Sequence, residues 1–147
     1  PEGCTPGFWK NHPDCWCDYY TPEMLLSDVF VGLNNEPYVS IDDDDRKSDF
    51  NNDTLADALR YRGGRGLAGT VRNMLRHATA ALLNACSSDV GYPISVEQVI
   101  GLVNLGLDSH DIAVIQDVHT LFAAWNEETP CPIDAHCRVI DDEVNGY

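Results

Sequence analysis

Six cysteines constrain this chain more than any other feature of its sequence. They form an even set in 147 residues and are spread from one end to the other: Cys4, Cys15, Cys17, Cys86, Cys131 and Cys137. An even, dispersed set is typical of disulfides formed in an oxidising compartment. We therefore expect an extracellular, secreted protein held together by covalent bridges.

The spacing of the cysteines narrows their pairing without deciding it. Cys15 and Cys17 are one residue apart, so they are expected to bond to different partners. Cys131 and Cys137 are natural partners for the N-terminal three, and each such bridge is worth ~4 kcal/mol in the chain-entropy account.

Zinc is the alternative use of these cysteines. Its ligands would be two thiolates and two imidazoles: Cys15, Cys17, His12 and His136. A Cys-X-Cys pair departs from the usual zinc-knuckle spacing, and each cysteine has a plausible bridge in an oxidising setting. Structural disulfides are favoured over zinc.

Between the cysteines, apolar residues recur at helical spacing, and 44% of the chain is apolar. The patterns predict helices over 22–31, over 54–64 with Asp53 or Thr54 as N-cap, over 66–86, from the capping box of Ser95 and Gln98, and from Ser109. Segment 66–86 is nearly apolar all round after His77, which predicts a central, buried helix. The expected fold is all-α: one disulfide-stapled helical bundle over residues 1–137.

Two segments depart from this helical pattern. Residues 32–53 are rich in turn formers and acids, and they are expected to form a long acidic surface loop. The tail, residues 138–147, contains β-prone Val139, Ile140 and Val144 but is too short to fold alone. It is expected to form a short β pairing with residues 38–41 or with another molecule.

The net charge of −15 is unevenly distributed. Five arginines occur without an intervening acid, namely Arg60, Arg62, Arg65, Arg72 and Arg76. Such an acidic chain argues against nucleic acid and anionic membranes as partners, and the sequence has no apolar run long enough for membrane insertion. The arginines are expected to meet an acidic surface, either within this molecule or on a neighbouring copy.

The acidic loop is the candidate metal site, and calcium is the candidate ion. Its oxygen donors would be Asp42, Asp43, Asp44, Asp45, Asp49, Asn51 and Asp53. The EF-hand pattern fails here, because Thr54 and Arg60 stand where Gly and Glu are required. A site of another geometry, in calcium-rich extracellular fluid, competes with a solvated run of charge. Asn52 begins a sequon, Asn52-Asp53-Thr54, and is a candidate for N-glycosylation.

No catalytic motif emerges from the sequence. It contains no Gly-X-Ser-X-Gly, no His-Glu-X-X-His and no phosphate-binding loop, so we expect that the protein is not an enzyme. His77 is interpreted as a hydrogen-bonded core histidine, and His110 and His119 are ~13 Å apart along one helix, too far to share an ion.

Four separated motifs resemble a domain of secreted, largely uncharacterised microbial proteins. They are Gly3 to Lys10, Gly66-Leu67 with Arg76 to Ala85, Tyr92-Pro93 to Val103, and Asn126-Glu127 with Cys131-Pro132. The resemblance implies an extracellular helical domain without known enzymatic activity. It also implies a Cys4–Cys131 bridge, which leaves Cys15 or Cys17 to bond to Cys137 and the other to bond to Cys86.

These observations favour a structural role. The leading hypothesis is a subunit of an extracellular filament or surface assembly, with further copies of the chain as partners. The alternative is a calcium-assisted module that binds glycans or a cell-surface partner. It rests on the N-terminal aromatic residues Phe8, Trp9, Trp16, Tyr19 and Tyr20, of which Trp9 is expected in the core.

Overall fold

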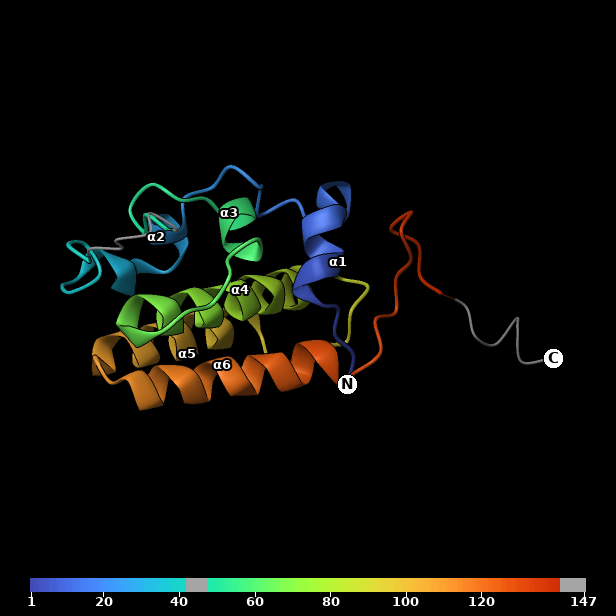
Figure 1. The fold of residues 1–147 in the computed structure, drawn as a ribbon. Coiled ribbons are helices and arrows are strands. Elements are labelled where there is room, and N and C mark those ends of the chain that lie inside the picture. Colours follow the sequence, from blue (N-terminus) through green and yellow to red (C-terminus); the bar gives the residue numbers. More distant parts are fainter. Residues whose placement is uncertain (42–47, 141–147) are drawn as a thin grey trace.

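A computed structural model describes residues 1–41 and 48–140 and shows a helical protein (Figure 1). The described residues contain no strand. The elements in chain order are α1 (Pro6–Asn11), η1 (Pro13–Cys15), α2 (Leu26–Val29), η2 (Val31–Asn34), α3 (Leu55–Leu59), α4 (Gly66–Cys86), α5 (Val96–Ser109) and α6 (Ile112–Glu127). None of the helices in these two ranges is long and apolar enough to cross a membrane.

Helix α4 runs through the middle of the molecule. The short helices α1, α2 and α3 lie along one side of it, and α5 and α6 lie along the other (Figure 1). Residues 77–84 of α4 are all buried, as expected for a helix that is apolar on every face. The predicted central helix is therefore confirmed, with the predicted bounds.

Capping boxes begin two of the helices, α3 and α5. At α3 the Thr54 hydroxyl accepts from the Asp57 amide while the Asp57 carboxylate accepts from the Thr54 amide, so Thr54 rather than Asp53 is the N-cap. Ser95 and Gln98 form the predicted capping box at α5. Each reciprocal pair satisfies two backbone donors that a helix leaves without partners.

The helix predicted over 22–31 forms only in part: Leu26–Val29 is α-helical, and Val31 begins the 3-10 helix η2. Leu25 forms an antiparallel bridge with Thr54, and the Leu55 amide donates to the Met24 carbonyl. The backbone before α2 therefore holds the start of α3 instead of forming a helical turn of its own.

Two other boundaries differ from the prediction. Helix α3 ends at Leu59, well before the glycine pair. Ser109 ends α5 instead of capping the next helix: His110 takes the left-handed conformation with φ 54°, and Asp111 caps α6. Asp111 accepts from the Ala113 amide, which is the bond expected of an N-cap.

The acidic segment 32–53 contributes to the core as well as to the surface. Tyr38 and Phe50 are both buried, and the Tyr38 hydroxyl donates to the Leu107 carbonyl on α5. Phe50 packs edge-on against Tyr61, with ring centroids 6.2 Å apart. Aromatic anchors thus attach both described ends of this segment to the helices.

The described part of the tail pairs with residues 132–134, just before it in the chain, and not with residues 38–41. Val139 forms an antiparallel bridge with Ile133, and the Ile140 amide donates to the Pro132 carbonyl at 2.7 Å. The expected β pairing thus occurs as a single bridge in the described part of the tail. Residues 141–147 lie outside the described residues.

Candidate functional site

Three disulfides gather where α1, the last turn of α4 and the chain after α6 meet. They are Cys4–Cys131, Cys15–Cys137 and Cys17–Cys86. The first agrees with the bridge that the resemblance implies, and the other two agree with the pairing left for the remaining cysteines. Among the described residues, one group has three potential metal-ligating atoms within 4.8 Å of one another, Asp14 with Cys15 and Cys137. Its two sulfurs are bonded to each other, so it offers no thiolate for zinc.

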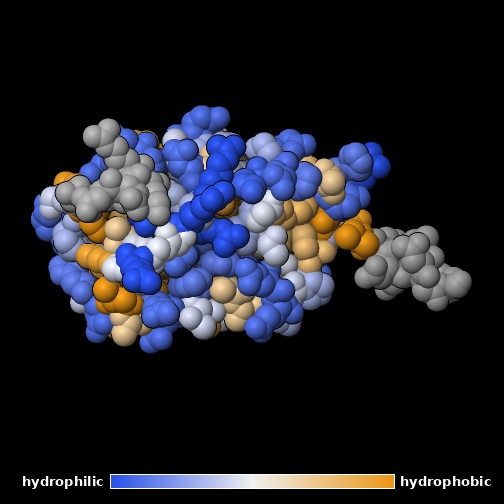
Figure 2. Space-filling view, in the orientation of Figure 1, coloured by the Kyte–Doolittle hydropathy of each residue, from blue (hydrophilic) through white to orange (hydrophobic). Residues whose placement is uncertain are grey.

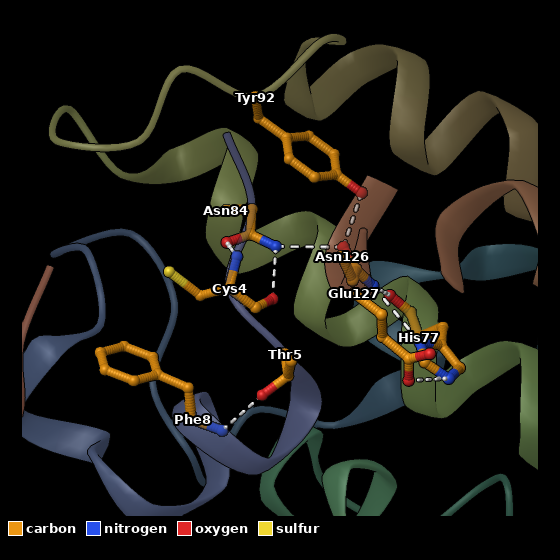
Figure 3. Close-up of polar contacts among 8 residues, drawn as sticks. All are labelled: Cys4, Thr5, Phe8, His77, Asn84, Tyr92, Asn126 and Glu127. Atoms are coloured by element: carbon orange, nitrogen blue, oxygen red, sulfur yellow. Dashed lines mark hydrogen bonds and ion pairs between the residues drawn. The ribbon is translucent and has the colours of Figure 1, made fainter. Parts of the chain in front are cut away.

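Asn84, buried on α4, makes three hydrogen bonds to the N-terminal segment and one to α6, and Figure 3 shows those to Cys4 and Asn126. Its Oδ1 accepts from the Cys4 amide at 2.8 Å and from the Trp9 indole at 3.1 Å. Its Nδ2 donates to the Cys4 carbonyl at 2.9 Å and to Asn126 Oδ1 at 3.0 Å. One side chain therefore satisfies both backbone groups of a disulfide-bonded cysteine.

Asn126 extends this network from α6 towards His77 and Tyr92. Its Oδ1 also accepts from the Tyr92 hydroxyl at 2.7 Å, and its Nδ2 donates to the His77 carbonyl at 2.9 Å (Figure 3). Burial raises the pKa of Tyr92, so its hydroxyl stays a donor. Because these polar groups hydrogen-bond to one another, the network fixes the fold and leaves little capacity for a ligand.

His77 is the histidine of this network, and its side chain is buried. Burial, with smaller effects from His119 and Arg76, lowers the pKa of His77 to about 4. The Glu127 carboxylate lies 3.6 Å from its Nε2, but Glu127 is half-exposed and does not offset the burial. The His77 and His119 rings stack with centroids 5.0 Å apart, across α4 and α6. The expected core histidine is therefore present, neutral at pH 7.

The arginines separate into one buried side chain and several exposed ones. Arg72 is buried and donates to the carbonyls of Arg62 and Gly63 and to the Ser48 hydroxyl. These bonds attach the chain before α4 to that helix, so the partners of Arg72 lie within the same molecule. The exposed arginines, Arg60 and Arg62 among them, make no ion pair with any described residue. A contact between them and a neighbouring copy therefore stays a prediction.

Four cations line one hollow between α1, α3 and α4, which we call the basic hollow. They are Lys10, Arg60, Arg62 and Arg76, and Asn73 lies beside them. Figure 2 shows the most hydrophilic colour gathered in a band over α3 and the chain that joins it to α4. The hollow combines side chains that are far apart in the sequence.

The candidate calcium donors fall into two groups. Asp42–Asp45 lie outside the described residues. Of the others, Asp49 accepts from the Asn51 amide and from Asn52 Nδ2, and Asp53 accepts from the Asp49 amide and the Tyr61 hydroxyl. Those carboxylates close a local turn, and calcium binding stays a prediction. Asn52 itself is exposed, as a glycosylation acceptor must be.

A second hollow lies beside the Cys17–Cys86 bridge. It is lined by Tyr19, Tyr20, Ser95 and Glu97, among others, and Tyr19 is 81% exposed. Trp16, in contrast, packs against two clusters of buried apolar side chains, one around Met74 and the other around Trp9. Its indole donates to the Trp9 carbonyl at 3.0 Å. Of the five N-terminal aromatic residues, Tyr19 is therefore the ring available to a ligand, and Trp9 is in the core as expected.

No protein-family model, curated protein or solved structure matches this chain. The resemblance to the secreted microbial domain accordingly stays a prediction, and function has to be argued from the geometry.

The sequence analysis missed the buried amides of Asn84 and Asn126. Asn84 was part of a motif but was given no role, although an amide within eight consecutive buried positions requires partners. The signal was an uncharged polar side chain in the most apolar helix. Its partners in the N-terminal segment are 75 and 80 residues away and its partner on α6 is 42 residues away, and sequence spacing does not identify them.

Proposed function

We propose that this protein is a secreted structural module, a subunit of an extracellular filament or surface assembly. The observation that carries the proposal is the covalent frame: three bridges span 127, 122 and 69 residues and converge at one end of the molecule. Bridges across such long loops mainly destabilise the unfolded chain, which suits a protein that must persist outside the cell.

The polar and charged groups support the same proposal. The polar groups of the Asn84–Asn126 network hydrogen-bond to one another, and its histidine, His77, is neutral and buried. The exposed groups, in contrast, include a cluster of cations on a chain of net charge −15. Complementary charge of this kind steers copies of one chain together.

The test is electron microscopy and light scattering of the protein as secreted, with calcium and with a chelator. Regular filaments, sheets or closed oligomers are expected. Monomers under both conditions would rule out the assembly. An assembly that disperses on chelation would in addition support calcium binding by the acidic loop.

The second candidate is a glycan-binding module, and Tyr19 favours it. An exposed aromatic ring beside a hollow with hydroxyl and carboxylate groups is a common arrangement for stacking against a sugar. Tyr19→Ala should abolish binding on a glycan array, whereas Tyr19→Phe keeps the ring and should retain it. Absence of binding by the unmodified protein would remove this candidate.

A further inference from the structure

The basic hollow is an unneutralised cation cluster on an acidic molecule. Lys10, Arg60 and Arg62 are exposed, Arg76 is half-buried, and none of the four side chains makes a hydrogen bond or ion pair with the described residues. Like charges held this close repel one another, so the arrangement costs free energy unless an anion is present. Arg72 shows that this chain can satisfy a guanidinium internally when the role is structural.

The floor of the hollow adds uncharged donors. Asn73 lines it, and its side-chain amide makes no hydrogen bond with the described residues. A β-carbon added at Gly63 would lie 2.5 Å from Asn73 Oδ1, so the glycine backbone packs directly against this amide. Guanidinium, ammonium and amide groups around one hollow are a donor set for carboxylates.

The acids that the structure describes next to this site do not occupy it. Asp53 and Asp57 line the adjoining hollow next to Arg60 and Arg62. Asp53 accepts from the Tyr61 hydroxyl and Asp57 accepts from the Thr54 amide, so both are committed to holding α3. They weaken the positive potential on that side and leave it strongest beside Lys10 and Arg76.

We infer that the basic hollow binds the acidic segment Asp141–Glu143 of a second copy of this chain. That segment places three carboxylates in a row, directly after the exposed apolar residues Val139 and Ile140. The two exposed residues are 57% and 45% accessible and would lose that exposure in a docked complex. The acidic segment follows the body of the molecule, whereas the hollow lies on the body itself, which gives a head-to-tail contact that can repeat.

The inference rests on the proposed self-assembly for its biological meaning, but its contact can be tested separately. A labelled peptide of residues 138–147 is titrated into the protein from which residues 141–147 have been removed. Binding is expected, and it should weaken roughly tenfold between low and physiological salt because exposed charges are screened. A peptide with Asp141→Asn, Asp142→Asn and Glu143→Gln should bind at least about tenfold more weakly.

Charge reversal locates the site. Arg62→Glu with Arg76→Glu should abolish peptide binding. Arg65 is an exposed arginine of the same five-arginine run but does not line the hollow, so Arg65→Glu should leave peptide binding nearly unchanged. A reversed peptide with three lysines in place of the acids should bind the reversed hollow, and this rescue excludes misfolding as the cause. Equal binding of the neutral peptide, or equal loss with Arg65→Glu, would overturn the inference.

The two proposals fail in different ways. If the full chain assembles but charge reversal in the hollow changes neither peptide binding nor the assembly, the inference is wrong and the structural role stands. If the full chain stays monomeric but the peptide binds the hollow specifically, the contact is real and the assembly is not. Tighter binding of poly-glutamate than of the peptide would assign the hollow to another polyanion and overturn the choice of occupant.

Discussion

The two ends of α4 are held in place by different forces. Along most of its length, α4 packs with α5 and α6 through a large apolar cluster that includes Met74, Leu82 and Phe122. At its C-terminal end the Cys17–Cys86 bridge and the Asn84 network attach it to the N-terminal segment, and the other two disulfides join that segment to the chain after α6. The apolar region depends on surface removed from water, and the disulfide end depends on covalent and hydrogen bonds between segments far apart in sequence.

This difference has a physical origin in the size of the two cores. The cluster at the disulfide end contains few buried side chains, among them Trp9 and Leu83. The segments packed there, residues 1–17 and 128–140, contain no long helix that could bury a continuous apolar face. Specific bonds replace apolar area in that part of the fold, and each of the following predictions tests this comparison.

The largest effect is expected from removing one bridge. The double variant Cys4→Ala, Cys131→Ala should lose about 3 kcal/mol of unfolding free energy, because with Cys15–Cys137 still closed it opens a loop of roughly 17 residues in the unfolded chain. Guanidinium unfolding of the oxidised proteins measures this loss. Cys17→Ala with Cys86→Ala should lose roughly 1 kcal/mol more, because with the other two bridges closed it opens a longer loop, of about 50 residues.

Hydrogen exchange on the same double variant tests whether the two regions are distinct. Amides of residues 6–17 should exchange faster, while those in the middle of α4 and α6 stay protected in the folded protein. Uniform loss of protection would contradict the division into two regions.

The next effect concerns the amide network. Asn84→Ala should cost about 3 kcal/mol or more, because it leaves the Cys4 amide and the Trp9 indole buried without an acceptor. Asn104→Ala is the matched control in the apolar region: it removes one bond, to the Gly32 amide, and should cost about 1 kcal/mol. If thermal unfolding showed the same loss of unfolding free energy for both variants, the Asn84 network would contribute no more than a single hydrogen bond.

The third effect is a dependence of stability on pH. The pKa of His77 is about 4 in the folded protein, below its ordinary value near 6.5, so the unfolded chain binds the proton more readily between these values. Unfolding free energy should therefore fall as the pH is lowered from about 6.5 to 4, by at most about 3 kcal/mol from this group, and change little below that window.

His77→Asn should flatten this part of the pH profile. His110→Asn is the control, because His110 is exposed at the left-handed end of α5, where asparagine is well tolerated. Urea unfolding at a series of pH values separates the two. An unchanged slope in His77→Asn would place the proton uptake elsewhere.

The smallest effect is expected in α5. A β-carbon at Gly101 meets nothing within 4 Å, so Gly101→Ala should raise stability by about 0.5 to 1 kcal/mol through helix propensity alone. At Gly69 the same change places a β-carbon 2.2 Å from the backbone of Gly64 and should destabilise instead. If both substitutions raised the thermal unfolding temperature, the loop before α4 would be able to move away from the added β-carbon at Gly69 at little cost in free energy.

Patterns within one segment predicted local structure well. The bounds of α4 follow from its Ala- and Leu-rich sequence, and the capping box at Ser95 follows from residue types three positions apart, whereas the sequence left Asp53 and Thr54 open as the N-cap of α3. Residues 22–25 and Ser109 were misassigned because their backbone or side-chain groups serve a neighbouring element. Helix propensity describes an isolated segment, whereas contacts with neighbouring elements decide the conformation of these residues.

The sequence by itself determined that this chain is helical, acidic and bridged by cysteines, because helix periodicity, net charge and cysteine number are properties of residues counted along a chain. Only the tertiary structure decided how Cys15 and Cys17 pair, that Asn84 bonds to Cys4 and Trp9, and that Lys10 joins three arginines around one hollow. These contacts join residues tens of positions apart, and packing of α1 and α3 against α4 brings them together.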